Sequence, residues 1–97
     1  MFEIYWTDEA QRHLDQLRKN RGLQKRYKAV VKAIRFLAAD PRHPSLQTHE
    51  FTSLKGPGGE KVFEAYAEQA TPPAYRIFWY CGPKKDQITV IAITPHP

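Results

Sequence analysis

The C-terminal half of the chain alternates β-prone runs with turn residues. The runs, rich in β-branched and aromatic side chains, cover residues 51–54, 62–67, 75–81 and 88–94. Glycine- and proline-containing turns at 56–59 and 82–86 separate neighbouring runs, and residues 71–73 form a longer connection. Because such short turns join antiparallel strands, this half predicts an antiparallel sheet. Residues 88–94 are the most β-prone run and are expected to form a central strand.

The N-terminal half predicts one strand followed by two helices. Residues 2–6 are β-prone, and Thr7 is a suitable N-cap ahead of an acidic first turn. An apolar stripe at helical spacing follows and predicts a first helix that stops at Gly22. A second stripe over residues 27–38 ends before Asp40-Pro41, because the residue before a proline disfavours the helical conformation.

These elements fit one domain spanning residues 1–97, which is enough chain for a single compact core. Residues 42–49 form a connecting loop in which Leu46 is the expected buried anchor. The order predicts an α+β fold of the β-α-α-β-β-β type. A helix hairpin then packs on one face of a small, mainly antiparallel sheet, where both apolar faces are buried together.

The sequence also indicates where the protein works. No apolar run approaches the roughly 20 residues of a membrane helix, and residues 1–6 lack the basic start of a signal peptide. The lone cysteine, Cys81, has no partner for a disulfide and is interpreted as a small strand residue in a reducing compartment. We therefore expect a cytoplasmic protein without membrane contact.

Positive charge is concentrated in the predicted helices. Residues 12–42 carry ten lysines and arginines against two aspartates, a net charge of +8, whereas the rest of the chain has five basic and eight acidic residues. Four of the basic residues fall off the apolar stripe of the second helix: Lys25, Lys28, Lys32 and Arg35. This block suits RNA, the ribosome or an acidic protein partner. The alternative is a solvated helix face.

Helices on one side leave the other face of the sheet open for a site. Strand alternation directs Glu64, Tyr66 and Glu68 toward that face, and Arg76 of the next run is expected to share it. An arginine in so apolar a strand is costly unless its guanidinium reaches water, a carboxylate or a ligand phosphate. A structural ion pair with Glu64 and a phosphate-binding role both satisfy this requirement.

Four histidines complete the list of titratable candidates. His96 follows the predicted central strand, which would deliver its imidazole to a fixed position for proton transfer. His43 and His49 lie six residues apart in the predicted loop and match no common zinc motif, and His13 stands alone on a helix. We interpret these three as surface or hydrogen-bonded histidines and expect no metal site.

The order of motifs resembles the RelE/ParE superfamily of toxins from toxin–antitoxin systems. The resemblance rests on Leu54-Lys55-Gly56, on the segment Tyr75-Arg76-Ile77-Phe78 and on an aliphatic strand that ends in His96, and it covers nearly the whole chain. It implies a type II toxin that represses translation by cutting mRNA in the ribosome. It also implies a cognate antitoxin protein as partner, and no cofactor.

The resemblance further implies roles for individual residues. Arg76 would bind the scissile phosphate, because a planar guanidinium suits the equatorial oxygens of the transition state. His96 matches the near-terminal histidine of the YoeB-like subgroup and would handle a proton during attack by the ribose 2′-hydroxyl. Lys55 would add positive potential near the RNA backbone. Glu50 lies near the position of a glutamate in that subgroup and is a further candidate.

Two departures from the family keep other functions open. Active members usually carry a basic group in the strand that here contains Glu64 and Tyr66, and many have a tyrosine where this chain has Pro97. These departures favour a ParE-like inhibitor of DNA gyrase or a catalytically inactive homologue. A different alternative is a non-catalytic RNA-binding module that stacks bases on Tyr66, Phe78 and Tyr80.

Overall fold

The computed structural model describes residues 1–68 and 74–95. In chain order its elements are strand β1 (Glu3–Trp6), helices α1 (Asp8–Lys19) and α2 (Gln24–Ala39), and strands β2 (His49–Lys55), β3 (Lys61–Tyr66), β4 (Tyr75–Cys81) and β5 (Gln87–Pro95). Short 3-10 helices η1 (Arg21–Leu23) and η2 (Pro44–Leu46) lie in the connections. The predicted α+β class is confirmed, and all four β-prone runs after the helices form strands, one more than the predicted order contains.

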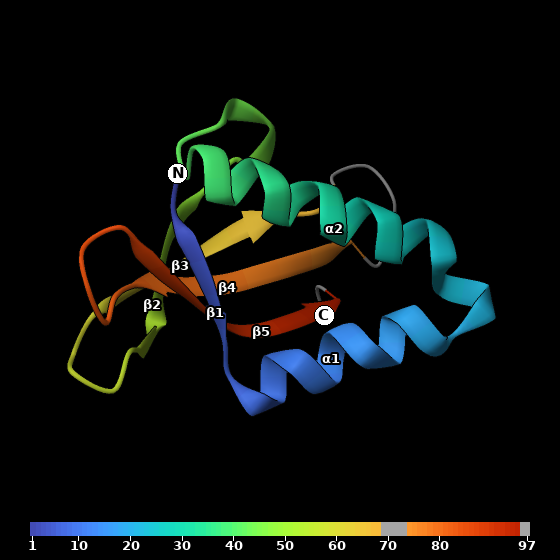
Figure 1. Cartoon of the computed structure of the whole chain (residues 1–97), viewed down its shortest axis with the longest axis horizontal. Helices are drawn as coiled ribbons and strands as arrows, with labels where there is room; N and C mark the ends of the chain where they lie inside the picture. The colour runs from blue at the N-terminus through green and yellow to red at the C-terminus, as the bar shows by residue number, and fades with distance from the viewer. Residues whose placement is uncertain (69–73, 96–97) are drawn as a thin grey trace.

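The strands form one five-stranded sheet in the order β1-β5-β4-β3-β2 (Figure 1). The neighbouring pairs among β2, β3, β4 and β5 are antiparallel, as the short turns predicted, whereas β1 pairs parallel to β5. The central position expected for residues 88–94 is confirmed, since β5 lies between β1 and β4. The longer connection predicted at residues 71–73 lies outside the described residues.

Both helices pack on the same face of the sheet. They run side by side in opposite directions as a hairpin (Figure 1). Their buried side chains meet those of the strands in one core, which contains Ala10, Leu17, Val30, Ala33, Leu37, Ala65, Ile77, Trp79, Ile88, Val90 and Ile93. Leu46 belongs to this core and is almost fully buried, which confirms it as the anchor of the loop.

The helix ends follow from local hydrogen bonds. Thr7 Oγ1 accepts a hydrogen bond from the Ala10 N–H at 3.1 Å, which confirms Thr7 as the N-cap of α1. The predicted stop at Gly22 is wrong, because α1 ends at Lys19 and the Asn20 side chain accepts from the Gly22 N–H to begin η1. Helix α2 ends just before Asp40, as predicted.

Hydrogen bonds also tie helix α1 to the sheet. Strand β1 pairs with β5 only as far as Val90. Beyond Val90, the edge of β5 that faces away from β4 has no strand beside it in the described sheet. The Ile93 N–H donates to His13 Nδ1 at 3.0 Å, and Thr7 Oγ1 donates to the Ile91 carbonyl at 3.3 Å. The side chains of Thr7, the N-cap of α1, and of His13 within α1 thus satisfy backbone groups that a longer β1 would otherwise pair.

Replacing Thr7 should therefore affect both the helix and its attachment. We expect Thr7→Ala to lower the free energy of unfolding by about 1–2 kcal/mol, because it removes an N-cap acceptor and a hydrogen bond to β5. Urea denaturation followed by circular dichroism measures this change. The exposed Thr52 offers a matched control, and Thr52→Ala should stay within about 0.5 kcal/mol of the unchanged protein. Equal stabilities of the two variants would contradict the role of Thr7.

Candidate functional site

Arg76 and Glu64 meet on the face of the sheet that the helices leave open. Their strand neighbours Ala65 and Ile77 belong to the helix-covered core, so alternation directs Glu64 and Arg76 to the opposite face. Arg76 NH1 donates to Glu64 Oε1 at 2.9 Å, and the two side chains are only 16% and 5% exposed. The predicted shared face is confirmed, and the ion pair with Glu64, one of the two roles left open for Arg76, is present.

His49 joins this pair from the neighbouring strand. It is the first residue of β2 and lies opposite Glu64 in the β2–β3 register, not in a loop as predicted. Its Nε2 lies 2.7 Å from Glu64 Oε1, and its Nδ1 lies 3.2 Å from the Gln47 carbonyl oxygen. Sequence reasoning identified a hydrogen-bonded histidine but no site residue. Continuing the alternation of residues 51–54 two positions backward would have placed His49 on a strand.

Tyr66 completes a group that we call the open-face cluster, which consists of His49, Glu64, Tyr66 and Arg76. The Arg76 guanidinium lies over the Tyr66 ring, 4.3 Å from its centroid, in cation–π geometry. The His49 ring meets the same tyrosine edge to face at 5.6 Å. Within the described part of the chain, Arg76 Nε is buried without a hydrogen-bond partner. The guanidinium therefore retains a donor that this part of the protein does not satisfy.

An aromatic pair lies beside the cluster. Phe78 is the Cα partner of Glu64 in the β3–β4 register, and its ring meets Phe51 of β2 at 5.0 Å. Tyr80, in contrast, is only 8% exposed. Its predicted use as a stacking surface is wrong, because a buried ring has no face to offer a base, whereas Tyr66 and Phe78 are partly exposed.

Lys55 and Glu50 lie away from the open-face cluster. Lys55 pairs with Lys61 at the far end of β3 from Tyr66, a separation of roughly 16 Å along the strand at about 3.3 Å per residue. Glu50 lies opposite Phe63, which stacks on Trp79 on the helix side of the sheet. The two residues contact each other instead, with Lys55 Nζ 3.7 Å from Glu50 Oε2.

His96 and Pro97 lie outside the described residues; the preceding residue, Pro95, is the Cα partner of Tyr75, the neighbour of Arg76 in β4. Glu68 does not share the open face, so that prediction is wrong. Its carboxylate accepts from Arg26 of α2 at 2.9 Å, because strand β3 ends at Tyr66 and the alternation ends with it.

The surface of α2 carries the predicted basic residues. Lys25, Lys28, Lys32 and Arg35 are all exposed. Neither helix in the described ranges is long and apolar enough to cross a membrane. Across residues 1–68 and 74–95, no three His, Cys, Asp or Glu side chains gather as they would around a metal ion. Cys81 is exposed at the end of β4, yet partial burial raises the pKa of its thiol, which therefore stays protonated at neutral pH.

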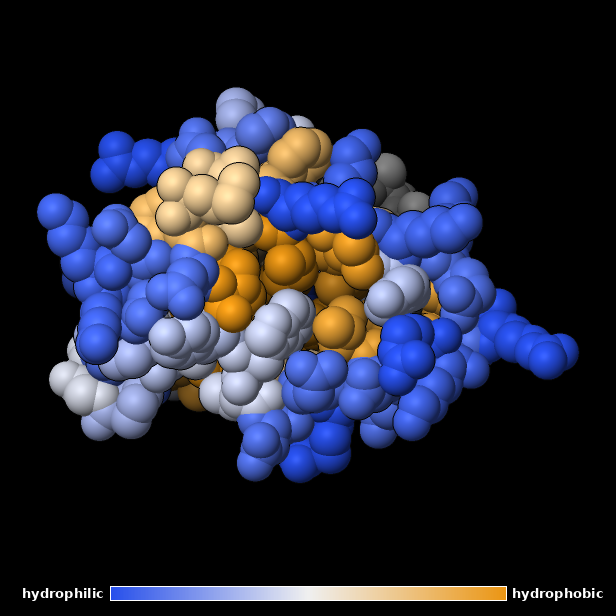
Figure 2. All heavy atoms as spheres, in the orientation of Figure 1, coloured by the Kyte–Doolittle hydropathy of each residue, from blue (hydrophilic) through white to orange (hydrophobic). Residues whose placement is uncertain are grey.

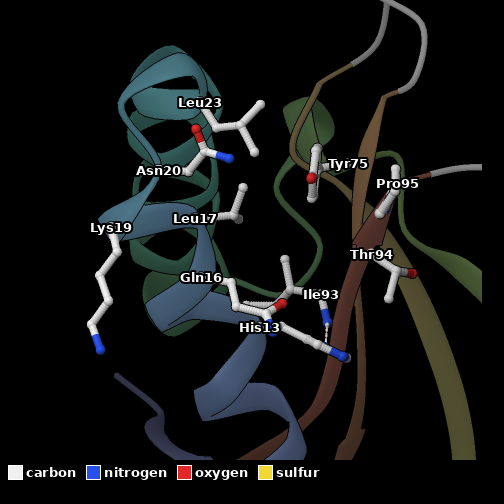
Figure 3. A pocket seen from close by; sticks show the side chains of 10 residues that line it. All are labelled: His13, Gln16, Leu17, Lys19, Asn20, Leu23, Tyr75, Ile93, Thr94 and Pro95. Atoms are coloured by element: carbon white, nitrogen blue, oxygen red, sulfur yellow. Dashed lines mark hydrogen bonds between the residues drawn. The ribbon is translucent and has the colours of Figure 1, made fainter.

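An apolar hollow separates the two helices. Figure 2 shows hydrophobic side chains gathered between α1 and α2 and surrounded by hydrophilic ones. One pocket of about 730 Å³ lies between α1 and the end of β5. In Figure 3, Leu17 and Leu23 face Tyr75 across this pocket, and His13 reaches toward the backbone of Ile93. The pocket lies on the helix side of the sheet and is separate from the open-face cluster.

The architecture of this chain matches that of two solved structures. No protein-family model and no curated protein matches the sequence. The YoeB/ParE toxin from Agrobacterium tumefaciens superposes with a TM-score of 0.71 at 14% identity, over 99% of this chain and 100% of that one. The archaeal RelE from Pyrococcus horikoshii OT3, crystallised in a RelE–RelB complex, gives a TM-score of 0.65 at 16% identity, over 97% and 93%. The chain has the RelE-like fold. The fold implied by the resemblance is therefore confirmed over nearly the whole chain.

The open-face cluster of this RelE-like domain makes a testable prediction about stability. Glu64→Ala should lower the free energy of unfolding by about 3 kcal/mol, because it leaves the partly buried Arg76 without its carboxylate. Arg76→Ala should cost less, about 1–2 kcal/mol, because Glu64 keeps His49 as a partner. Chemical denaturation at pH 6 measures both changes.

The control is Glu50→Ala, since the ion pairs of Glu50 with Lys55 and Lys61, at 3.7 and 4.0 Å, are long and lie on the surface. It should change stability by less than about 0.5 kcal/mol. A larger loss from Arg76→Ala than from Glu64→Ala would show that His49 does not support Glu64.

Proposed function

We propose that the protein is the toxin of a type II toxin–antitoxin system and acts as a metal-independent endoribonuclease that cuts mRNA on the ribosome. The observation that carries the proposal is a RelE-like fold with a partly buried arginine on the open face of its sheet. Arg76 is held by Glu64 and Tyr66, and its Nε–H has no hydrogen-bond partner among residues 1–68 and 74–95. Such a preorganised guanidinium suits a phosphate.

In the proposed reaction the ribose 2′-hydroxyl attacks the adjacent phosphorus. The new bond joins this oxygen to phosphorus, the bond to the 5′ oxygen of the next nucleotide breaks, and a cyclic phosphate and a free 5′-hydroxyl result. Arg76 stabilises the negative charge on the non-bridging oxygens, and His96 transfers a proton. Lys55 contacts the RNA backbone farther along the sheet, since roughly 16 Å of strand separates it from the level of Arg76.

The proposed partner is a cognate antitoxin protein. The archaeal RelE of similar fold was crystallised with RelB, which supports a partner of this kind. The exposed basic side chains of α2 suit an acidic peptide as well as ribosomal RNA, and the apolar hollow between the helices suits hydrophobic side chains. Because the proposed target is the translating ribosome, the proposed site of action is the cytoplasm.

A second candidate function is ParE-like inhibition of DNA gyrase without RNA cleavage. The observation that favours it is the short ion pair between Arg76 and the buried Glu64. If this pair only stabilises the sheet, Arg76 binds no phosphate and the chain is a gyrase inhibitor or an inactive homologue. The contacts of Glu64 with Arg76 and His49 favour the nuclease, because a carboxylate paired with an arginine repels RNA much less than an isolated one.

Induced expression distinguishes the two functions. The nuclease should arrest growth and leave new mRNA 5′ ends within translated codons, which sequencing of 5′ ends detects. Intact messages together with double-strand DNA breaks would assign the protein to gyrase inhibition instead.

Point variants test the proposed roles. Arg76→Ala and His96→Ala should each reduce mRNA cleavage by about 100-fold or more while the fold is retained, because each removes a group that acts on the transition state. Arg76→Lys should remain strongly impaired, since an ammonium lacks the planar fork. The exposed Lys84 provides a control, and Lys84→Ala should cleave normally. A folded His96→Ala protein with full activity would remove His96 from the mechanism.

A further inference from the structure

One carboxylate oxygen of Glu64 contacts two basic side chains at once. Oε1 accepts from Arg76 NH1 at 2.9 Å and lies 2.7 Å from His49 Nε2. The Glu64 side chain is 5% exposed, so water contributes little to its solvation. A buried carboxylate that loses its partner is strongly destabilised. The stability of the Glu64 carboxylate in this buried position therefore depends on its contacts with both residues.

The ring of His49 is fixed from three directions. Its second nitrogen, Nδ1, lies 3.2 Å from the Gln47 carbonyl oxygen, which can only accept a hydrogen bond. Both ring nitrogens thus face oxygen atoms of the protein, Nε2 the Glu64 carboxylate and Nδ1 the Gln47 carbonyl. Tyr66 packs edge to face against the ring at 5.6 Å. Both nitrogens are already engaged, so this geometry favours holding Glu64 over exchanging protons with a substrate.

This arrangement solves a difficulty for Arg76. If Arg76 were the sole partner of Glu64, turning its guanidinium toward a phosphate would leave a buried anion unpaired. With His49 in place, the carboxylate keeps a partner while the guanidinium engages an incoming anion. The Arg76 Nε–H is buried and has no partner in the described ranges, so it becomes a donor for such an anion once the guanidinium turns outward.

We propose that His49 is a positioning residue that holds Glu64 and thereby releases Arg76 to bind a phosphate group. The inference deepens the proposed function and rests on the role of Arg76 as a phosphate ligand. It names a residue that acts through Glu64, and it requires no contact between His49 and the RNA. The groups that face His49 are Glu64 and Tyr66 from β3, Arg76 from β4 through the shared carboxylate, and the Gln47 carbonyl.

The test measures phosphate binding directly. Inorganic phosphate is titrated into the full-length protein while the ¹⁵N-labelled Arg76 Nε–H is followed by NMR. His49→Ala should bind phosphate about tenfold more weakly than the unchanged protein, because Arg76 can then leave Glu64 only by unpairing it. The His49 side chain is 48% exposed, so the variant should remain folded.

Charge rescue separates this role from simple packing. Glu64→Gln removes the charge that His49 holds, so the double variant His49→Ala/Glu64→Gln should bind phosphate within about threefold of Glu64→Gln alone. His43→Ala is the matched control and should bind as the unchanged protein does. His43 stacks on Phe36 and accepts from the Ser45 N–H, and neither contact involves the cluster.

Three results would overturn the proposal. These are unchanged affinity in His49→Ala, a double variant as weak as His49→Ala, and failure of the unchanged protein to shift the Arg76 signal. Cleavage of mRNA is assayed separately on the same proteins. Phosphate binding with the expected pattern but no cleavage would refute the nuclease and keep the role of His49, so the two failures are distinguishable.

Discussion

The parallel pairing of β1 with β5 is the constraint on which the rest of the structure depends. It joins the two ends of the described chain and places β5 inside the sheet. Because β1 stops early, Thr7 and His13 of the following segment bond to the backbone of β5. Helix α1 is thereby fixed on one face and α2 packs beside it. The opposite face is left for polar residues that a helix-covered sheet could not hold.

On that open face, Glu64 organises the charged groups. A buried carboxylate is retained only where several donors compensate its lost hydration. Arg76 and His49 supply these donors from the two neighbouring strands, and Tyr66 packs against both. The cluster is therefore a structural element of the sheet, and in the proposed function it also holds Arg76 ready to bind a phosphate.

The RelE-like fold by itself does not decide the activity. The two superposed structures are 14% and 16% identical to this chain in sequence. Identities this low support a shared architecture and nothing more specific. The functional argument rests on particular side chains. Arg76 favours a nuclease, and its ion pair with Glu64 favours a structural role unless His49 can take over the carboxylate. The same three residues thus separate the two candidate functions.

The sequence by itself determined the class of the fold, the antiparallel strands, the N-cap of α1, the end of α2 and the open face shared by Glu64 and Arg76. These follow from periodicity and turn chemistry, which act over a few residues. Only the tertiary structure brought His49 to Glu64 and separated Lys55 and Glu50 from Arg76. Those positions depend on the β2–β3 register and its irregularity between Glu50 and Lys55, which local patterns do not encode.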